Sequence, residues 1–300
     1  MRTALVTGAS RGLGRAITDA LVARDWYVLA GVRKPEDFVP PDPNRCVAIR
    51  LDLLDDASIA AAAAEAVHLA RTSPGGHLDA IVSNAGITTY GPFEESRPDE
   101  WHDVFQTNVL GPMRLTQLLL PELRAARGRI VVVSSEAASY GMPAVGVYAA
   151  SKAATSRWAE SLAHEVGPLG VRVTILEPGG HHTDIAFDFP RHIDANGPYA
   201  GQMRALERRV KVVQKGLLRS PAGFGERVAD ILDDNRPPRR RPVGPDAWAI
   251  NLGARLLPVR ALAAVVQIVS GGTRRWGSRA RRAGRSGAGS RPGPSPRAGR

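Results

Sequence analysis

Short runs of β-branched and other apolar residues alternate with longer segments of helical periodicity over residues 2–243. This alternation is typical of βαβ units, in which helices join parallel strands. Several of the runs are apolar almost throughout, as expected for strands that are covered on both faces of a sheet. The predicted strands are residues 3–7, 27–32, 47–51, 79–83, 129–134 and 171–176.

The segments between these runs have the composition and spacing of helices. One of them contains a run of alanines, the residue with the highest helix propensity. The predicted helices are residues 13–24, 57–71, 98–124 and 149–166. We therefore predict an α/β fold, a doubly wound parallel sheet that is Rossmann-like and has helices on both faces. One domain over residues 1–246 would contain it.

The alternation of strand and helix patterns ends after Pro178, and residues 185–220 form an insert that contains Phe187, Phe189 and Tyr199. We predict loop and helix here. An insert after the sixth strand lies at the carboxyl ends of the strands, where open α/β sheets bind their ligands. The insert is therefore the expected substrate loop.

The C-terminal part of the chain differs from the rest in composition. Residues 247–272 are largely apolar, but Arg255, Pro258 and Arg260 interrupt them, which favours an amphipathic helical extension over a membrane span. Residues 273–300 consist mainly of Gly, Ser, Pro and Arg. Such a segment cannot form a core, so we predict a disordered, arginine-rich tail.

Overall composition excludes several classes of protein. Of the 300 residues, 43% are hydrophobic and 23% are charged, which excludes a disordered protein, a collagen and a disulfide scaffold. The single cysteine, Cys46, has no partner for an internal disulfide. The first residues run directly into an apolar strand without the pattern of a signal peptide. We expect a cytoplasmic protein.

The net charge of +11 is concentrated near the C-terminus. Residues 273–300 contain nine arginines and no acidic residue, which leaves residues 1–272 at +2. A solvated tail without a specific role is the favoured interpretation. Nucleic acid is not an expected partner, because Trp276 is the only aromatic residue of the tail that could stack on bases. Weak peripheral membrane contact through the C-terminal helix and basic tail stays open as an alternative.

A glycine-rich turn follows the first strand and opens the first helix, with the spacing G-x3-G-x-G. Glycines at this position let the backbone approach a pyrophosphate, and the helix N-terminus presents N–H groups and a positive dipole to it. The position of the turn therefore predicts nucleotide binding. Its residues are Gly8, Ser10, Arg11, Gly12, Leu13 and Gly14.

The end of the second strand has cations where NAD-binding folds usually have an acid. Arg33 and Lys34 occupy this place, and Arg11 lies within the glycine turn itself. A planar guanidinium can donate two hydrogen bonds to one phosphate. The sequence therefore predicts NADP(H) rather than NAD(H) as cofactor. Solvated strand-end charges are the alternative interpretation of Arg33 and Lys34.

Four polar residues follow or lie near the ends of predicted strands. Tyr148 and Lys152 are separated by four positions at the start of a predicted helix and so share one face. Ser135 follows an apolar strand, and Asn108 lies in the long helix after the fourth strand. Catalytic groups in α/β sheets are presented at the carboxyl ends of the strands. We therefore expect these side chains to form one site.

Together these motifs resemble the short-chain dehydrogenase/reductase family, in its shorter, single-domain branch. Their order and spacing fit the family over about the first 185 residues. The matching segments are TGASRGLG (7–14), LDLLD (51–55), NAG (84–86), Asn108, VVVSS (131–135), YAASK (148–152) and PGGHHT (178–183). The resemblance implies an oxidoreductase that transfers a hydride between a nicotinamide and a carbonyl or secondary alcohol.

The resemblance also implies roles for individual residues. Tyr148 would be the general acid and base, and Lys152 would lower its pKa. Ser135 would hydrogen-bond the substrate oxygen, and Asn108 would hold a water for a proton relay. Further cofactor contacts beyond the glycine turn would come from Arg33, Asp52, Leu53, Asn84, Ala85, Gly86, Tyr148, Lys152, Pro178, Gly179 and Thr183.

The composition of the insert bears on the substrate class. The aromatic and aliphatic residues of 185–220, with few acids among them, suggest an apolar substrate and a similarity to the retinol- and hydroxysteroid-dehydrogenase-like members. A non-catalytic NADP(H)-binding sensor on the same fold is the alternative function, although a sensor has no need of the four polar residues. An epimerase or dehydratase of the longer branch is disfavoured, because its turn has the spacing G-x-x-G-x-x-G.

Three further expectations concern metal, assembly and the end of the sheet. We expect no metal at His181 and His182, because adjacent residues rarely face one ion. The family often assembles through its long helices, so we expect a homo-oligomer through residues 98–124 and 149–166. Residues 240–245 stand where the family usually has a glycine-rich strand and loop, which leaves the last strand and the dimer arrangement open.

Overall fold

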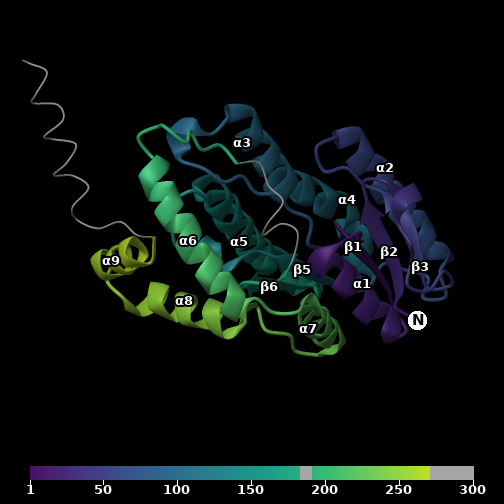
Figure 1. Cartoon of the computed structure of the whole chain (residues 1–300). Helices are drawn as coiled ribbons and strands as arrows, with labels where there is room; N and C mark the ends of the chain where they lie inside the picture. The colour runs from purple at the N-terminus through teal and green to yellow at the C-terminus, as the bar shows by residue number, and fades with distance from the viewer. Residues whose placement is uncertain (183–190, 271–300) are drawn as a thin grey trace, which may run out of the picture.

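The structure is a computed structural model that describes residues 1–182 and 191–270, without the side chains of 211–217 and 269–270. Within these residues, seven strands form one parallel sheet in the order β3-β2-β1-β4-β5-β6-β7 (Figure 1). The strands are β1 (Thr3–Thr7), β2 (Tyr27–Val32), β3 (Cys46–Arg50), β4 (Ala80–Ser83), β5 (Arg129–Val133), β6 (Arg172–Pro178) and β7 (Arg240–Val243). The strand order reverses between β1 and β4, the place where doubly wound sheets bind ligands.

Helices cover both faces of this sheet (Figure 1). The helices of the described residues are α1 (Gly12–Ala23), α2 (Asp56–Thr72), α3 (Pro98–Phe105), α4 (Gly111–Ala125), α5 (Gly146–Val166), α6 (Ala200–Leu217), α7 (Pro221–Asp233), α8 (Pro245–Leu256) and α9 (Val259–Ser270). One core cluster lies beneath α1 and α7, and the other beneath α2, α4 and α5. Along β1, Ala4 and Val6 belong to the first cluster and Leu5 to the second, as the alternation of a strand requires. The predicted doubly wound α/β fold is confirmed.

Within residues 1–178, the predicted strands and helices agree with the observed ones to within three residues at each end, with one exception. Residues 98–124 do not form a continuous helix, because η3 (Gln106–Leu110), a π-helical turn, separates α3 from α4. The side chain of Asn108 in this turn is hydrogen-bonded to the backbone of Ile87. Hydrophobic periodicity does not reveal such a turn, since the residues on both sides of it are helical.

β7 is present at the edge of the sheet, where the sequence left the last strand open. Its pairing with β6 runs from Ile175 opposite Arg240 to Pro178 opposite Val243. Pro242 fits this strand because an edge strand does not need every N–H group for pairing. The arginine- and proline-rich segment therefore replaces the glycine-rich one without loss of the strand.

The predicted C-terminal helical extension consists of two helices rather than one. α8 ends at Leu256, and Leu257 adopts an extended backbone (φ −84°, ψ 137°). The residue before a proline is disfavoured in the helical region, so Pro258 explains the break. Among the described residues, no helix combines the length and hydropathy needed to cross a bilayer. The predicted disordered tail, residues 273–300, lies outside the described residues.

Candidate active site

The glycine turn has a backbone that only glycine adopts without strain. Gly8 (φ +68°) and Gly12 (φ +57°) lie in the left-handed region. A Cβ on Gly14 would lie 2.0 Å from the carbonyl oxygen of Gly8, so the turn also closes too tightly for a side chain. Arg11, the N-cap of α1, makes no side-chain capping bond, which leaves the first N–H groups of α1 available to an anion.

The glycine turn is held against the end of β4. The Thr7 hydroxyl accepts hydrogen bonds from the N–H groups of Asn84 and Ala85, both at 3.0 Å. The Asn84 side chain donates to the carbonyl of Thr7, also at 3.0 Å. A Cβ on Gly8 would lie 3.0 Å from the Cα of Ala85. The turn and the predicted cofactor residues after β4 therefore form one surface at the switch point of the sheet.

The end of β2 lies next to this turn. The N–H groups of Gly8 and Ala9 donate to the Gly31 carbonyl at 2.9 and 3.3 Å. Arg33 follows two residues later and is exposed, as is Lys34, whose ammonium lies 3.9 Å from Asp37. Exposed cations therefore stand at the place where a ribose phosphate of a nucleotide on the turn would lie.

Two further predicted cofactor residues lie after β3. Asp52 is half-buried and accepts a hydrogen bond from the N–H of Leu54 at 3.0 Å, while Leu53 is buried. The Leu53 carbonyl accepts a hydrogen bond from Gln106 at 3.2 Å. This loop is therefore joined to the π-helical turn η3.

Asn108 connects η3 to the loop after β4 and to α5. Its Oδ1 accepts from the N–H of Ile87 at 2.8 Å, and its Nδ2 donates to the Ile87 carbonyl at 2.9 Å and to the Ser151 hydroxyl at 3.0 Å. The side chain is 2% exposed. Because all three bonds are satisfied, the position of Asn108 is fixed.

Lys152 lies beside Asn108 in the interior. Its Nζ donates to the carbonyl of Val133 at 2.9 Å. A Cβ on Gly86 would lie 3.4 Å from this Nζ and 3.2 Å from Oδ1 of Asn108, so the glycine leaves room for both polar groups. Burial lowers the pKa of Lys152 to about 8.

Tyr148 and Ser135 share a hydrogen bond. The Ser135 hydroxyl also accepts from the N–H of Ala137 at 3.1 Å. Burial is the largest influence on Tyr148 and raises its pKa, while the bond with Ser135 acts in the opposite direction. The Lys152 ammonium donates to Val133 and lies 5.9 Å from the tyrosine ring centroid, and its lowering of this pKa stays a prediction.

The loop after β6 is closed by a residue from α8. The carboxylate of Asp246 accepts from the N–H of Gly180 at 2.8 Å and pairs with Arg219. A Cβ on Gly179 would lie 2.2 Å from Oδ1 of Asp246. Pro178 is buried at the end of β6, whereas Thr183, the last predicted cofactor residue, lies outside the described residues.

The histidines of this region have other partners. Nδ1 of His181 lies 2.9 Å from the Gly179 carbonyl, and its ring meets Phe224 edge-on at 5.5 Å. Nε2 of His192 lies 2.7 Å from Oε1 of Glu100. Residues 1–182 and 191–270 contain no cluster of three or more potential metal ligands.

Comparison with known proteins identifies the family. Residues 2–193 match the family model described as short chain dehydrogenase. The chain belongs to the short-chain dehydrogenase family. It is therefore an oxidoreductase that uses a nicotinamide nucleotide and acts on CH–OH or C=O groups of small molecules.

Relatives and solved structures extend this likeness over most of the chain. An NADPH-dependent 3-dehydrocapnine reductase of Ornithobacterium rhinotracheale is 30% identical, with 87% of this chain and 95% of the relative covered. A short-chain dehydrogenase from Streptomyces avermitilis has a TM-score of 0.75 at 35% identity, covering 91% of this chain and 98% of that one. A short-chain dehydrogenase from Burkholderia cenocepacia in complex with NADP has a TM-score of 0.70 at 26% identity, with 89% and 99% covered.

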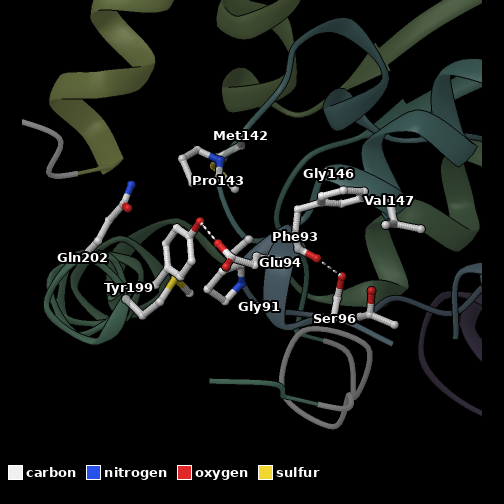
Figure 2. A pocket seen from close by; sticks show the side chains of 14 residues that line it. Gly91, Phe93, Glu94, Ser96, Met142, Pro143, Gly146, Val147, Tyr199 and Gln202 are labelled. Carbon is white, nitrogen blue, oxygen red and sulfur yellow. Dashed lines mark hydrogen bonds between the residues drawn. The ribbon is translucent and has the colours of Figure 1, made fainter. Parts of the chain in front are cut away.

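A pocket of about 500 Å³ lies next to the N-terminal end of α5 in this short-chain dehydrogenase (Figure 2). The loop after β4, the loop before α5 and the start of α6 form it. The Tyr199 hydroxyl donates to Glu94 at 2.6 Å across its edge. Gly146 and Val147, which precede Tyr148, belong to its lining. Apolar lining residues include Phe93, Met142, Pro143, Val147 and Met203.

Glu136 is a residue of the site that the motifs did not reveal. It is half-buried in η4 (Glu136–Ser139), directly after Ser135, and its Oε2 has no hydrogen-bond partner. Burial and the charge of Asp246 raise its pKa to about 7. Its charge in turn raises the pKa of Tyr148. The signal was present in the sequence as an acid adjacent to the predicted catalytic serine.

Proposed function

We propose that this short-chain dehydrogenase transfers a hydride between NADP(H) and a carbonyl or secondary alcohol of an apolar substrate, with Tyr148 as general acid and base. The observation that carries the proposal is a continuous set of contacts. Tyr148 is bonded to Ser135, and Lys152 lies with Asn108 around Gly86. Gly86 belongs to the loop that the glycine turn holds in place.

The glycine turn and its surroundings fit a dinucleotide. Gly8 and Gly14 leave no room for side chains, so the backbone itself would contact the pyrophosphate. Arg33 and Arg11, both exposed, are the groups we assign to the 2′-phosphate of NADP(H). The NADPH dependence named for the Ornithobacterium relative and the NADP complex of the Burkholderia protein support this choice.

The remaining contacts to the nucleotide are proposed from their places around the turn. Ser10, Gly12 and Leu13 would complete the pyrophosphate site. Asp52 and Leu53 would hold the adenine, and Lys152 would hold the ribose hydroxyls beside the nicotinamide. Residues placed along the cofactor are Asn84, Ala85, Gly86, Pro178, Gly179 and Thr183.

When bound, the nicotinamide supplies the hydride for reduction or accepts it in oxidation. In reduction, the Tyr148 hydroxyl gives its proton to the substrate oxygen while the carbonyl carbon gains the hydride, so that the product is a neutral alcohol. Ser135 donates a hydrogen bond to the same oxygen as charge develops on it. In oxidation, Tyr148 takes the proton back.

Lys152 returns the tyrosine to its starting protonation state. A lysine with a pKa of about 8 both gives and takes a proton near neutral pH. Asn108 is fixed by three hydrogen bonds beside it, which suits the role of holding a water next to Lys152. These roles need no metal ion.

The pocket supports an apolar substrate. Phe93, Met142, Val147 and Met203 provide apolar surface in the pocket, which Gly146 and Val147, directly before Tyr148, also line, and about 500 Å³ accommodates a molecule larger than a simple ketone. We also propose a homo-oligomer through α4 and α5, whose outer surfaces are the ones on which the family commonly assembles.

Titration of the purified protein with NADPH and with NADH, read by nicotinamide fluorescence, tests the cofactor assignment. We expect NADPH to bind more tightly, and Arg33→Asp to weaken it by roughly 10- to 100-fold, as for the loss of charge-assisted bonds. Arg208→Asp, an exposed arginine on α6, is the control and leaves NADPH binding unchanged. Equal binding of both nucleotides would contradict the phosphate role of Arg33.

A panel of ketones and alcohols of increasing length tests the reaction. Tyr148→Phe is expected to reduce kcat by roughly 10²- to 10⁴-fold while nucleotide binding persists. Tight nucleotide binding without turnover on any member of the panel would instead favour the non-catalytic sensor.

A further inference from the structure

The last two helices of the described residues present an apolar surface to solvent. In α8, Ala247 and Asn251 face the body and are buried. Trp248 (59% exposed), Leu252 and Leu256 (71%) follow one another at a spacing of four residues and face outward. Large apolar side chains are rarely left exposed in such a row.

Exposed apolar side chains also follow the break between the helices. Val259 is 83% exposed and Ile268 is 71% exposed, and α9 is anchored by Arg209 of α6, which donates to the carbonyl of Ile268. We call the exposed apolar side chains of both helices the α8–α9 face. Its members are Trp248, Leu252, Leu256, Leu257, Val259, Val265 and Ile268.

This concentration is specific to the α8–α9 face. Of the fourteen exposed large apolar side chains in the described residues, seven lie between residues 248 and 268. The other seven, such as Val39, Leu54 and Leu169, are spread over residues 1–169 and belong to several different elements and loops. A scatter of single side chains is normal for a soluble protein, whereas seven on two adjoining helices indicate an interaction surface.

The charge of the chain has the same location. Residues 247–300 contain eleven arginines and no acidic residue, so residues 1–246 are neutral and this segment accounts for the whole net charge of +11. Arg255 and Arg260 are exposed beside the break of the α8–α9 face, and the other nine arginines follow it in the sequence. A segment that combines exposed apolar side chains with arginines and has no acidic residue is complementary to anionic lipid.

We propose that the α8–α9 face, with the exposed Arg255 and Arg260 beside it, binds this protein to the surface of a bilayer that contains anionic lipid. The apolar side chains enter the boundary between headgroups and acyl chains, and the arginines contact the headgroups. Each attraction is weak alone, and their combination gives stable binding.

Two other partners fit the surface less well. A nucleic acid would use the arginines but has no use for the row of leucines and valines. A second copy of the chain would bring its own Arg255 and Arg260 against the same surface, and like charges repel. The proposal does not depend on the reaction or on the cofactor.

Flotation of the full-length protein with vesicles provides the test. We expect binding to phosphatidylcholine vesicles with about 30% phosphatidylglycerol, and at least roughly tenfold weaker binding to phosphatidylcholine alone. Raising the salt from roughly 50 mM to roughly 500 mM should also weaken binding to the anionic vesicles at least roughly tenfold, because salt screens the attraction between the arginines and the headgroups.

A triple variant separates the apolar contribution from the charge. Trp248→Ser/Leu252→Ser/Leu256→Ser changes exposed side chains, and we expect at least roughly tenfold weaker binding to anionic vesicles. Val39→Ser/Leu54→Ser/Leu169→Ser removes three exposed apolar side chains elsewhere and should leave binding unchanged. Circular dichroism and NADPH titration of both variants verify the fold.

Four results would overturn the proposal. Equal binding to both kinds of vesicle would remove the role of the arginines, and unchanged binding of the α8 variant would remove the role of the apolar face. If the α8 variant has a lower molar mass than the wild type in light scattering, and neither the variant nor the wild type binds vesicles, the face would be assigned to contact with a second copy of the chain. Binding of duplex DNA but not of vesicles would assign the arginines to nucleic acid.

Discussion

Replacing Asn108 with alanine tests how the active site of this short-chain dehydrogenase is held together. The variant loses the bonds at 2.8 and 2.9 Å to the backbone of Ile87 and the bond at 3.0 Å to Ser151. Each contributes about 1 kcal/mol net, so the free energy of unfolding should fall by about 3 kcal/mol. The partners are left in a buried site, which makes this a lower bound.

Urea and thermal unfolding, followed by fluorescence and circular dichroism, measure this loss. A change of about 3 kcal/mol corresponds to a Tm lower by about 6–12 °C in a domain of this size. Asn44→Ala, in the exposed loop before β3, is the control and should stay within about 0.5 kcal/mol of the wild type. A fall of less than about 1 kcal/mol for the Asn108 variant would refute the conclusion that this side chain fastens η3 to the loop after β4.

Two further variants give three predictions. In Glu136→Gln the pH profile of alcohol oxidation should move to lower pH, because the carboxylate raises the pKa of Tyr148; a profile that stays or moves upward would contradict this. Burial raises the pKa of Glu136 from 4.5 to about 7. The free energy of unfolding of the wild type should therefore fall by roughly 3 kcal/mol as pH rises from 4.5 through 7. Urea titrations at several pH values should show a smaller fall in Glu136→Gln. Gly14→Ala should abolish NADPH binding, since its Cβ would lie 2.0 Å from the carbonyl oxygen of Gly8. The control Gly223→Ala in α7 meets nothing within 4 Å and should raise the free energy of unfolding by roughly 0.5–1 kcal/mol. Retained NADPH binding in Gly14→Ala would show that the turn can rearrange.

The parts of the fold that the sequence predicted are those that local patterns determine. The strands of the sheet are buried on both faces and therefore appear as apolar runs, as in β1. The glycine turn requires positive φ at Gly8 and Gly12, a demand that is visible in the residues themselves. Tyr148 and Lys152 share a helix face because of their spacing alone.

The parts that it missed depend on contacts between distant residues. The π-helical turn is set by bonds between Asn108 and Ile87, which are 21 positions apart. The carboxylate of Asp246 closes the loop at Gly180 from 66 positions away. The environment of Glu136, including the charges of Asp246 and Arg219, likewise exists only after α8 has packed on η4. No local pattern encodes such contacts.

The π-helical turn restricts how this chain can vary in length. Deletion of one residue within 106–110 would let α3 and α4 join as one regular helix, whose backbone hydrogen bonds have better geometry than those of a π turn. The same deletion would rotate Asn108 by about 100° around the helix axis and away from Ile87. Selection for a more stable helix and selection for the active site therefore act in opposite directions at this turn, and a single-residue deletion here could raise stability while it removes activity.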